Sequence, residues 1–293
     1  MSTDLGKLGV WAWLDAFSAP EAANFAKQLE DWGYTALWIP EAVGRDPFTL
    51  IGYLAGKTEN LVFATGIANI YARDPMTMKA AQQTISEMAP GRFVLGLGVS
   101  HQHLVSKIRG HDYQKPLTAM TNYLQNLEKA LYMGTQPKES APIVIGALRD
   151  KMLGLAASQT AGAHPYLVPP EHTARARQVM GDDAWLCPEQ MVLLETDATK
   201  ARAIARAELK VYIGLPNYKN NLRQFDFGDA DFADGGSDRL VDAIVAWGDE
   251  QVIADRIQAH HDAGANHVCI QAFRPDGAPG PDLRALEAFA PSR

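Results

Sequence analysis

Short apolar stretches alternate with helical patterns along the whole chain. The stretch LGVWAW at residues 8–13 has the apolar and aromatic content of a buried strand. Residues 19–33 then carry apolar side chains at helical spacing, and Gly33 stands where a helix ends. This pattern predicts that the chain begins with a strand followed by a helix.

The same alternation continues to the C-terminus. The further expected strands, each with a helical pattern nearby, are residues 36–42, 61–70, 92–100, 141–148, 162–168, 189–196 and 267–273. Strands separated by helices pair in parallel through right-handed crossovers, and about eight of them favour an α/β fold of the closed (β/α)8 TIM-barrel type. The alternative, a doubly wound sheet, predicts a GxGxxG turn after the first strand, and none follows Trp13.

One stretch interrupts this alternation after the seventh strand. Residues 215–240 are rich in Asn, Asp, Gly and aromatic side chains, and two helical runs at 237–247 and 249–264 follow before the last strand. Long excursions in barrels usually cover or shape the mouth of the active site. We therefore expect a single domain over residues 1–293, with an inserted lid-like segment at about 214–238.

Composition and charge limit the classes of function. The 293 residues carry a formal net charge of -7 without a stripe of Lys or Arg, so nucleic acid and anionic membrane are not expected partners. No apolar run approaches the ~20 residues that span a bilayer, and the N-terminus lacks a secretion signal, which predicts a cytoplasmic protein. Cys187 and Cys269 lack metal-ligand spacing, so neither a disulfide nor a zinc site is expected.

Polar and aromatic residues close most of the expected strands. Barrel enzymes place their sites at the C-terminal ends of the strands, so these residues are the candidates for chemistry. They are Trp11, Trp13, Glu41, Arg45, Gly66, Asn69, Tyr71, Arg73, Ser100, His101, His103, Gly146, Arg149, His164, Tyr166, Asn217 and Tyr218.

Glu41 directly follows the second strand. Burial there could raise the pKa of its carboxyl group toward use as a general acid. The alternative is an ion pair with Arg45, four residues further on. The sequence favours neither interpretation.

His101 and His103 close the fourth strand, and in an extended chain both would point to one side. A metal site would need a third ligand, which the sequence does not offer, so we expect no metal and favour a hydrogen bond from His101 to a cofactor. The run from Gly96 to Gly98 lacks the helix that a phosphate motif requires, and glycine there suits the close approach of something flat.

Gly146 and Ala147 follow the fifth strand and precede a helix. Uncovered backbone N–H groups there, with Arg149 and Lys151 nearby, would suit an anionic group. A helix cap with surface charges explains the same residues equally well.

With these residues assembled, the chain resembles the bacterial luciferase-like superfamily and, within it, the coenzyme F-420-dependent oxidoreductases. The stretches that carry the resemblance are ALWIPEAVGRDPF, ATGIANIYARDPMTM, PGRFVLGLGVSHQ, GAHPYLVPPEHTARAR, LPNYKNNLRQFDF and GGSDRLVDAIVAWG. The resemblance implies a (β/α)8 barrel with an insertion near the seventh strand, a homodimer, and a flavin-type cofactor.

The resemblance also implies roles for individual residues. Several members of the superfamily hold a non-prolyl cis peptide in a bulge of the third strand against the deazaflavin ring, which here falls at Gly66 and Ile67, with Asn69 beside it. The other residues expected at the cofactor are Gly98, Ser100, His101, Gly146, Ala147 and Leu148, the last three near its phosphate-bearing tail. The expected substrate wall is Trp13, Tyr71, Asn217 and Tyr218.

Two positions depart from the related glucose-6-phosphate dehydrogenases. Those enzymes have Ser-Asp-His where this chain has Pro40-Glu41-Ala42, and a glutamate in place of His101. The sugar-phosphate activity is therefore not supported, and His101 and Glu41 become the candidate acid and base.

The resulting hypothesis is hydride transfer between F-420 and a small organic substrate, a carbonyl, alcohol, imine or activated alkene. One alternative is a monooxygenase of the same fold that uses reduced FMN. A non-catalytic flavin-binding protein and, more remotely, a metal-dependent barrel hydrolase also stay open.

Overall fold

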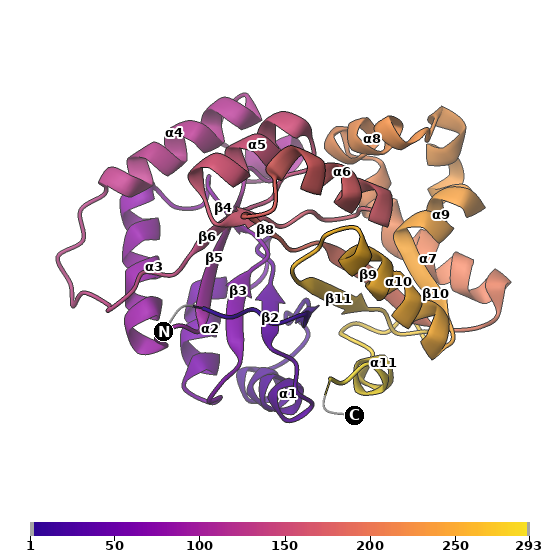
Figure 1. Ribbon diagram of the computed structural model, residues 1–293, viewed down its shortest axis with the longest axis horizontal. Coiled ribbons are helices and arrows are strands. Elements are labelled where there is room, and N and C mark those ends of the chain that lie inside the picture. The colour runs from indigo at the N-terminus through magenta and orange to yellow at the C-terminus, as the bar shows by residue number, and fades with distance from the viewer. Residues whose placement is uncertain (1–2, 292–293) are drawn as a thin grey trace.

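Parallel strands and helices alternate through the computed structural model, which describes residues 3–291 (Figure 1). The strands are β1 (Leu8–Trp11), β2 (Ala36–Ile39), β3 (Val62–Thr65), β4 (Ala68–Asn69), β5 (Phe93–Gly98), β6 (Ile143–Ile145), β7 (Gly162–Ala163), β8 (Trp185–Leu186), β9 (Glu189–Leu194), β10 (Val245–Gly248) and β11 (Val268–Ala272). The helices are α1 (Ala19–Asp31), α2 (Pro47–Ala55), α3 (Pro75–Met88), α4 (Pro116–Lys129), α5 (Asp150–Gln159), α6 (Pro170–Met180), α7 (Ala198–Ile213), α8 (Pro216–Leu222), α9 (Asp238–Ile244), α10 (Glu250–Asp262) and α11 (Leu283–Ala288).

The strands form a closed ring. From β11 the order runs through β1, β2, β3, β5, β6 and β7 to β8, all in parallel pairs. Residues 185–189 close the ring, because they form backbone hydrogen bonds with β7 on one side and with β11 on the other. The Cys187 N–H donates to the Ala163 carbonyl, and the Cys269 N–H donates to the Pro188 carbonyl. The barrel fold predicted from the sequence is thereby confirmed.

Local sequence signals explain where the helices begin. Ser18 and Glu21 form a reciprocal capping box before α1, in which the Ser18 N–H donates to the Glu21 carboxylate at 2.7 Å. The Asp74 carboxylate accepts the N–H groups of Met76 and Thr77 at 2.9 and 3.0 Å, and Pro75 occupies the first turn of α3. These caps fix the residues at which α1 and α3 begin.

One strand agrees with the expectation from the resemblance, and one segment differs from the sequence prediction. The third strand is divided into β3 and β4 by Gly66 and Ile67, whose peptide bond is cis, as the resemblance implied. Residues 245–247 were expected to be helical and instead belong to β10 (Val245–Gly248), which pairs in parallel with β9. The helical pattern stops at Ile244, and the apolar run that follows is buried against the sheet, where strand geometry satisfies its backbone.

The segment around residues 214–238 forms α8 and two short 3-10 helices, Arg223–Phe225 and Asp229–Gly235. It packs beside α7 and α9 at the right of Figure 1. Tyr218, Leu222, Phe227 and Phe232 are buried in an apolar cluster with α7, separate from the main core. This cluster holds the segment against the end of the barrel.

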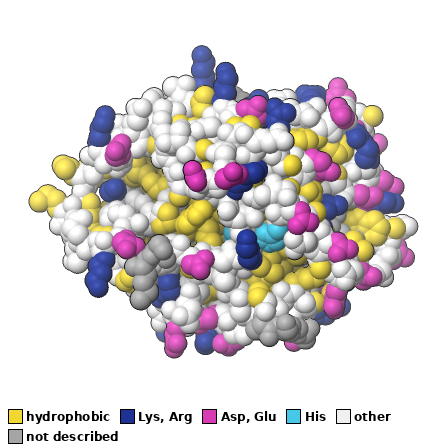
Figure 2. All heavy atoms as spheres, viewed as in Figure 1, with side chains coloured by type: hydrophobic (Ala, Val, Ile, Leu, Met, Phe, Trp, Pro, Cys, Tyr) yellow, Lys and Arg dark blue, Asp and Glu magenta, His cyan; other side chains and the backbone are white. Residues whose placement is uncertain are grey.

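The surface carries both signs of charge. On the face shown in Figure 2, basic and acidic side chains are interspersed between apolar patches. Within residues 3–291, no helix combines the length and the apolar composition needed to cross a membrane.

Candidate active site

A cavity of about 330 Å³ opens where the C-terminal ends of the strands meet. It contains most of the residues selected from the sequence: Trp13, Glu41, Gly66, Ile67, Gly98, Ser100, His101, Gly146, Ala147, Leu148, Asn217 and Tyr218. The insertion contributes two of these, Asn217 and Tyr218, from α8. Residues far apart in the sequence thus line one pocket, as barrel geometry requires.

Asn69 and Tyr71 do not line this cavity. The Asn69 side chain is fully buried behind it, where its Oδ1 accepts the Tyr71 N–H at 2.9 Å. The Asn69 Nδ2 has no partner among residues 3–291. The Tyr71 hydroxyl accepts the N–H of Gln114 at 3.0 Å, so both residues support the loop beneath the pocket.

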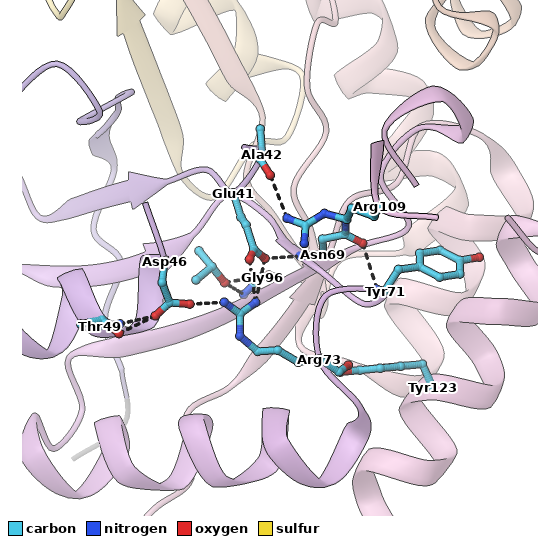
Figure 3. Close-up of polar contacts among 11 residues, drawn as sticks. Glu41, Ala42, Asp46, Thr49, Asn69, Tyr71, Arg73, Gly96, Arg109 and Tyr123 are labelled. Atoms are coloured by element: carbon cyan, nitrogen blue, oxygen red, sulfur yellow. Dashed lines mark hydrogen bonds and ion pairs between the residues drawn. The ribbon is translucent and has the colours of Figure 1, made fainter. Parts of the chain in front are cut away.

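Glu41 is held by an arginine other than the one that its spacing suggested. Its two carboxylate oxygens accept from Arg73 Nη1 at 2.7 and 2.9 Å, and one of them also accepts the Asn69 N–H at 2.8 Å (Figure 3). Arg73 also pairs with Asp46, whereas Arg45 bonds elsewhere. The contact between Glu41 and Arg73, which we call the Glu41 clamp, ties the loops after β2 and β4 together.

The bulge between β3 and β4 leaves no room for larger side chains. The Trp11 indole N–H donates to the Gly66 carbonyl at 2.8 Å, and a Cβ at Gly66 would lie 2.9 Å from the Trp11 Nε1. A Cβ at Gly98 would overlap the side chain of Ile67. A side chain at Gly66 or Gly98 would therefore require Trp11 or Ile67 to move.

The chain turns sharply after β5. Ser100 has a φ of 55°, and residues 103–108 form a π-helix, so His101 and His103 do not share one side of an extended strand. His103 is exposed, whereas His101 faces the cavity with its ring 5.5 Å from that of Tyr218. Burial lowers the pKa of His101, and a hydrogen bond with Asn217 opposes that shift. His101 is therefore mostly neutral at pH 7.

Aromatic rings form a further part of the cavity wall. The ring of Tyr166 lies 5.3 Å from Tyr212 and 6.2 Å from Tyr218, and Trp13 meets Trp11 at 5.3 Å and 88°. Burial raises the pKa of Tyr166 and of Tyr218. The hydroxyls therefore stay protonated and can donate hydrogen bonds in an apolar wall.

His164 was among the strand-end candidates but was not selected, although it also lines the cavity. Its Nδ1 bonds the Cys187 carbonyl at 2.8 Å, and its ring stacks on Trp38 at 4.4 Å. Burial lowers the pKa of His164 to about 4, so the ring is neutral and Nε2 is an acceptor without a partner among residues 3–291. In the sequence, the signal that could have selected His164 was its place directly after a strand in GAHPYLV.

The loop after β6 offers fewer free donors than the sequence suggested. The Gly146 N–H already donates to the Leu97 carbonyl at 2.8 Å. The Leu148 carbonyl accepts from His172 Nε2 at 2.6 Å, while Arg149 and Lys151 are exposed. The loop is thus held firmly at the cavity, with positive charge at its outer side.

These features fit a planar cofactor. The cavity volume lies in the usual range for small-molecule sites, about 300–1,000 Å³. Glycines, the Ile67 side chain and aromatic rings line the cavity, and an unpartnered nitrogen of His164 lies at it. Among residues 3–291, no cluster of His, Cys, Asp or Glu has the arrangement of a metal site.

A family model for luciferase-like monooxygenases matches residues 4–267. The chain belongs to this family. The resemblance seen in the sequence is thereby confirmed.

Curated relatives in the luciferase-like family include several oxidoreductases. A putative coenzyme F420-dependent oxidoreductase of Mycobacterium tuberculosis is 24% identical over 250 residues, which cover 71% of each chain. A 5,10-methylenetetrahydromethanopterin reductase of Archaeoglobus fulgidus is 30% identical over 155 residues, covering 47% of this chain and 46% of that protein.

Solved structures with the same fold extend over nearly the whole chain. The F420-dependent tetrahydromethanopterin reductase of Methanopyrus kandleri has a TM-score of 0.72 at 18% identity and covers 98% of both chains. An F420-dependent secondary alcohol dehydrogenase, in complex with an F420-acetone adduct, has a TM-score of 0.76 at 13% identity over 99% of this chain and 98% of that one. A type II Baeyer-Villiger monooxygenase of Pseudomonas putida, in complex with FMN, has a TM-score of 0.71 at 14% identity and covers 98% and 97%. At these identities, the similarity to the solved structures establishes the fold of this chain.

Proposed function

We propose that the protein is an oxidoreductase that transfers a hydride between coenzyme F-420 and a small organic substrate. The observation that carries the proposal is the bulge at Gly66 and Ile67, which lines one cavity together with aromatic side chains. The named activity of the relatives, F420-dependent in several cases, supports the deazaflavin over FMN. When bound, the deazaflavin would supply the hydride acceptor or donor.

The cofactor would be held by residues on three neighbouring strand ends. Gly66 and Ile67 would support one face of the ring, and Gly98, Ser100 and His101 would border it. Gly146, Ala147 and Leu148 would lie toward the phosphate-bearing tail, next to the exposed charges of Arg149 and Lys151. Asn69 would act from behind the bulge, through the loop that it supports.

We propose that His101 donates or accepts the proton that is transferred together with the hydride. Its ring faces the cavity, is largely neutral at pH 7, and is oriented by Asn217. Glu41 was the other candidate, but both of its oxygens are engaged by Arg73 and the Asn69 N–H. We therefore give Glu41 a positioning role: the Glu41 clamp holds the bulge in place.

The substrate would lie against Trp13, Asn217 and Tyr218. The last two belong to the inserted segment at about 214–238, which supports a lid-like role for that segment in one domain. No Lys or Arg among the described residues lines the cavity, and the Glu41 charge is matched by Arg73. An uncharged reacting group suits these walls, whereas Tyr71, which bonds Gln114, supports them from outside.

A second candidate is an FMN-dependent monooxygenase, favoured by the FMN-bound structure with the same fold. Oxygen consumption in the presence of reduced FMN would distinguish it. A homodimer, which the family resemblance implies, would appear in light scattering at twice the chain mass of 31.9 kDa.

The deciding experiment is a pair of equilibrium titrations with F-420 and with FMN. We expect saturable binding of F-420 that is at least tenfold tighter than that of FMN. A matched control is Glu128→Gln, an exposed residue on α4, which should leave both affinities unchanged. Absence of saturable F-420 binding to the folded protein would refute the proposal.

A further inference from the structure

A second cavity, of about 340 Å³, lies beside the first and shares Trp11 and Trp13 with it. It is bounded by the ends of β1 and β11, by α7, and by the loop at residues 274–281. The two tryptophans therefore form a partition, with the candidate active site on one side and this cavity on the other. We call it the outer cavity.

The charge in the outer cavity is not balanced. Glu208, a solvent-exposed residue of α7, lies in its lining and has no hydrogen-bond or ion-pair partner among residues 3–291. Arg274 also lines the cavity, but its guanidinium is bound to the Asp276 carboxylate at 3.0 and 2.6 Å. Once that pair is counted as neutral, one negative charge remains.

The partition itself suits a cation. Trp13 is partly exposed, and its ring stands at 88° to that of Trp11, so two indole surfaces meet at the boundary. Indole faces attract organic cations through the ring quadrupole. The Trp13 N–H is engaged by the Tyr212 hydroxyl, which fixes the ring.

A hydrogen-bonded link connects the two cavities. Gln271 lines the outer cavity, and its Oε1 accepts from the hydroxyl of Tyr166, which lines the first. A ligand group in the outer cavity would thus contact the same side chains that form the wall of the reaction pocket.

We propose that the outer cavity binds an organic ammonium group of the substrate, whose reacting carbon lies in the first cavity. Glu208 supplies the countercharge, and Trp13 supplies an aromatic surface. An anionic group would be repelled by this carboxylate, and an uncharged group would gain nothing from its charge. This assignment rests on the proposed function for what happens in the first cavity, but its binding chemistry can be tested alone.

The test uses probes of one shape and different charge. They are naphthalen-2-ylmethylammonium, naphthalen-2-ylmethanol and 2-naphthoate, titrated calorimetrically into the full-length protein with and without F-420. A partly exposed charge pair with a cation–π contact is worth about 1 kcal/mol, so the ammonium should bind about fivefold more tightly than the alcohol. The naphthoate should bind most weakly.

Two variants locate the preference. Glu208→Gln removes the charge at nearly constant shape and should bring the ammonium and the alcohol to equal affinity. Glu128→Gln, on the exposed face of α4, should keep the fivefold preference. The F-420 affinity should be the same in all three proteins.

Equal binding of the three probes by the wild-type protein, or an ammonium preference that survives in Glu208→Gln, would overturn the assignment. Failure of F-420 to bind any of the proteins would instead refute the proposed function, since the probe titrations without cofactor would still report on the outer cavity.

Discussion

Glu189, at the start of β9, is a buried carboxyl group without a charged partner. Its side chain is 1% exposed, one oxygen accepts the Leu167 N–H at 3.4 Å, and the other has no partner among residues 3–291. Burial raises its pKa from 4.5 to about 8. We predict that Glu189→Gln stabilises the protein relative to wild type increasingly as the pH rises.

The sign follows from the protons bound in each state. Between pH 4.5 and about 8 the unfolded carboxyl loses its proton while the folded one keeps it, so the wild type loses stability as the pH rises. Each pH unit costs about 1.4 kcal/mol, which amounts to about 3 kcal/mol at pH 7 as an upper value. Glutamine does not titrate, so the variant escapes this cost, while any penalty for burying its amide is independent of pH.

The assay is urea unfolding of both proteins at intervals from pH 4.5 to pH 8. The difference in unfolding free energy, variant minus wild type, should rise by about 3 kcal/mol between pH 4.5 and pH 7. Buried histidines titrate in both proteins and cancel in this difference.

The control is Glu195→Gln at the end of the same strand. There a hydrogen bond from Lys200 lowers the pKa of the carboxyl, so its titration is nearly complete at the acid end of this range and the difference curve should stay flat above about pH 5.5. Curves for Glu189→Gln and wild type that stay parallel across this pH range would refute the reasoning.

Three further predictions concern the pocket. His101→Ala should lower kcat about 100-fold with little change in Tm, and an unchanged kcat would remove His101 from the mechanism. In the wild type, the rate of substrate oxidation should fall only below pH 6.5, because burial lowers the pKa of His101. Gly98→Ala should push Ile67 into the cavity and weaken F-420 binding about tenfold in titrations, and unaltered affinity would show that Ile67 is not at the cofactor. Asn69→Ala removes the acceptor for the Tyr71 N–H and should weaken F-420 binding while costing about 1 kcal/mol of stability by urea unfolding; global unfolding would mean that the amide is purely structural.

The barrel and most of its helices could be predicted because their signals are local. Asp74 and Pro75 mark the start of α3 by side-chain chemistry that acts within one turn. The position of the Gly66–Ile67 bulge came from family resemblance, since apolar spacing alone indicated only an interrupted strand.

What could not be predicted depends on contacts between distant segments. The partner of Glu41 is Arg73, 32 positions away, and no spacing rule connects the two. Residues 245–247 continue an apolar run that was predicted as helix, but the pairing of β10 with β9 decides their conformation. The outer cavity likewise exists only because α7 and the loop after β11 meet at Trp13.

The insertion and the Glu41 clamp bear on how such a protein can diverge over generations. The insertion packs in an apolar cluster that it shares with α7, β9 and β10, and it supplies Asn217 and Tyr218 to the pocket wall. The clamp joins two loops through buried charges, and a change in either partner leaves the other unmatched. Changes in the insertion can therefore reshape the pocket wall from one segment, while changes in the clamp must occur in both partners together.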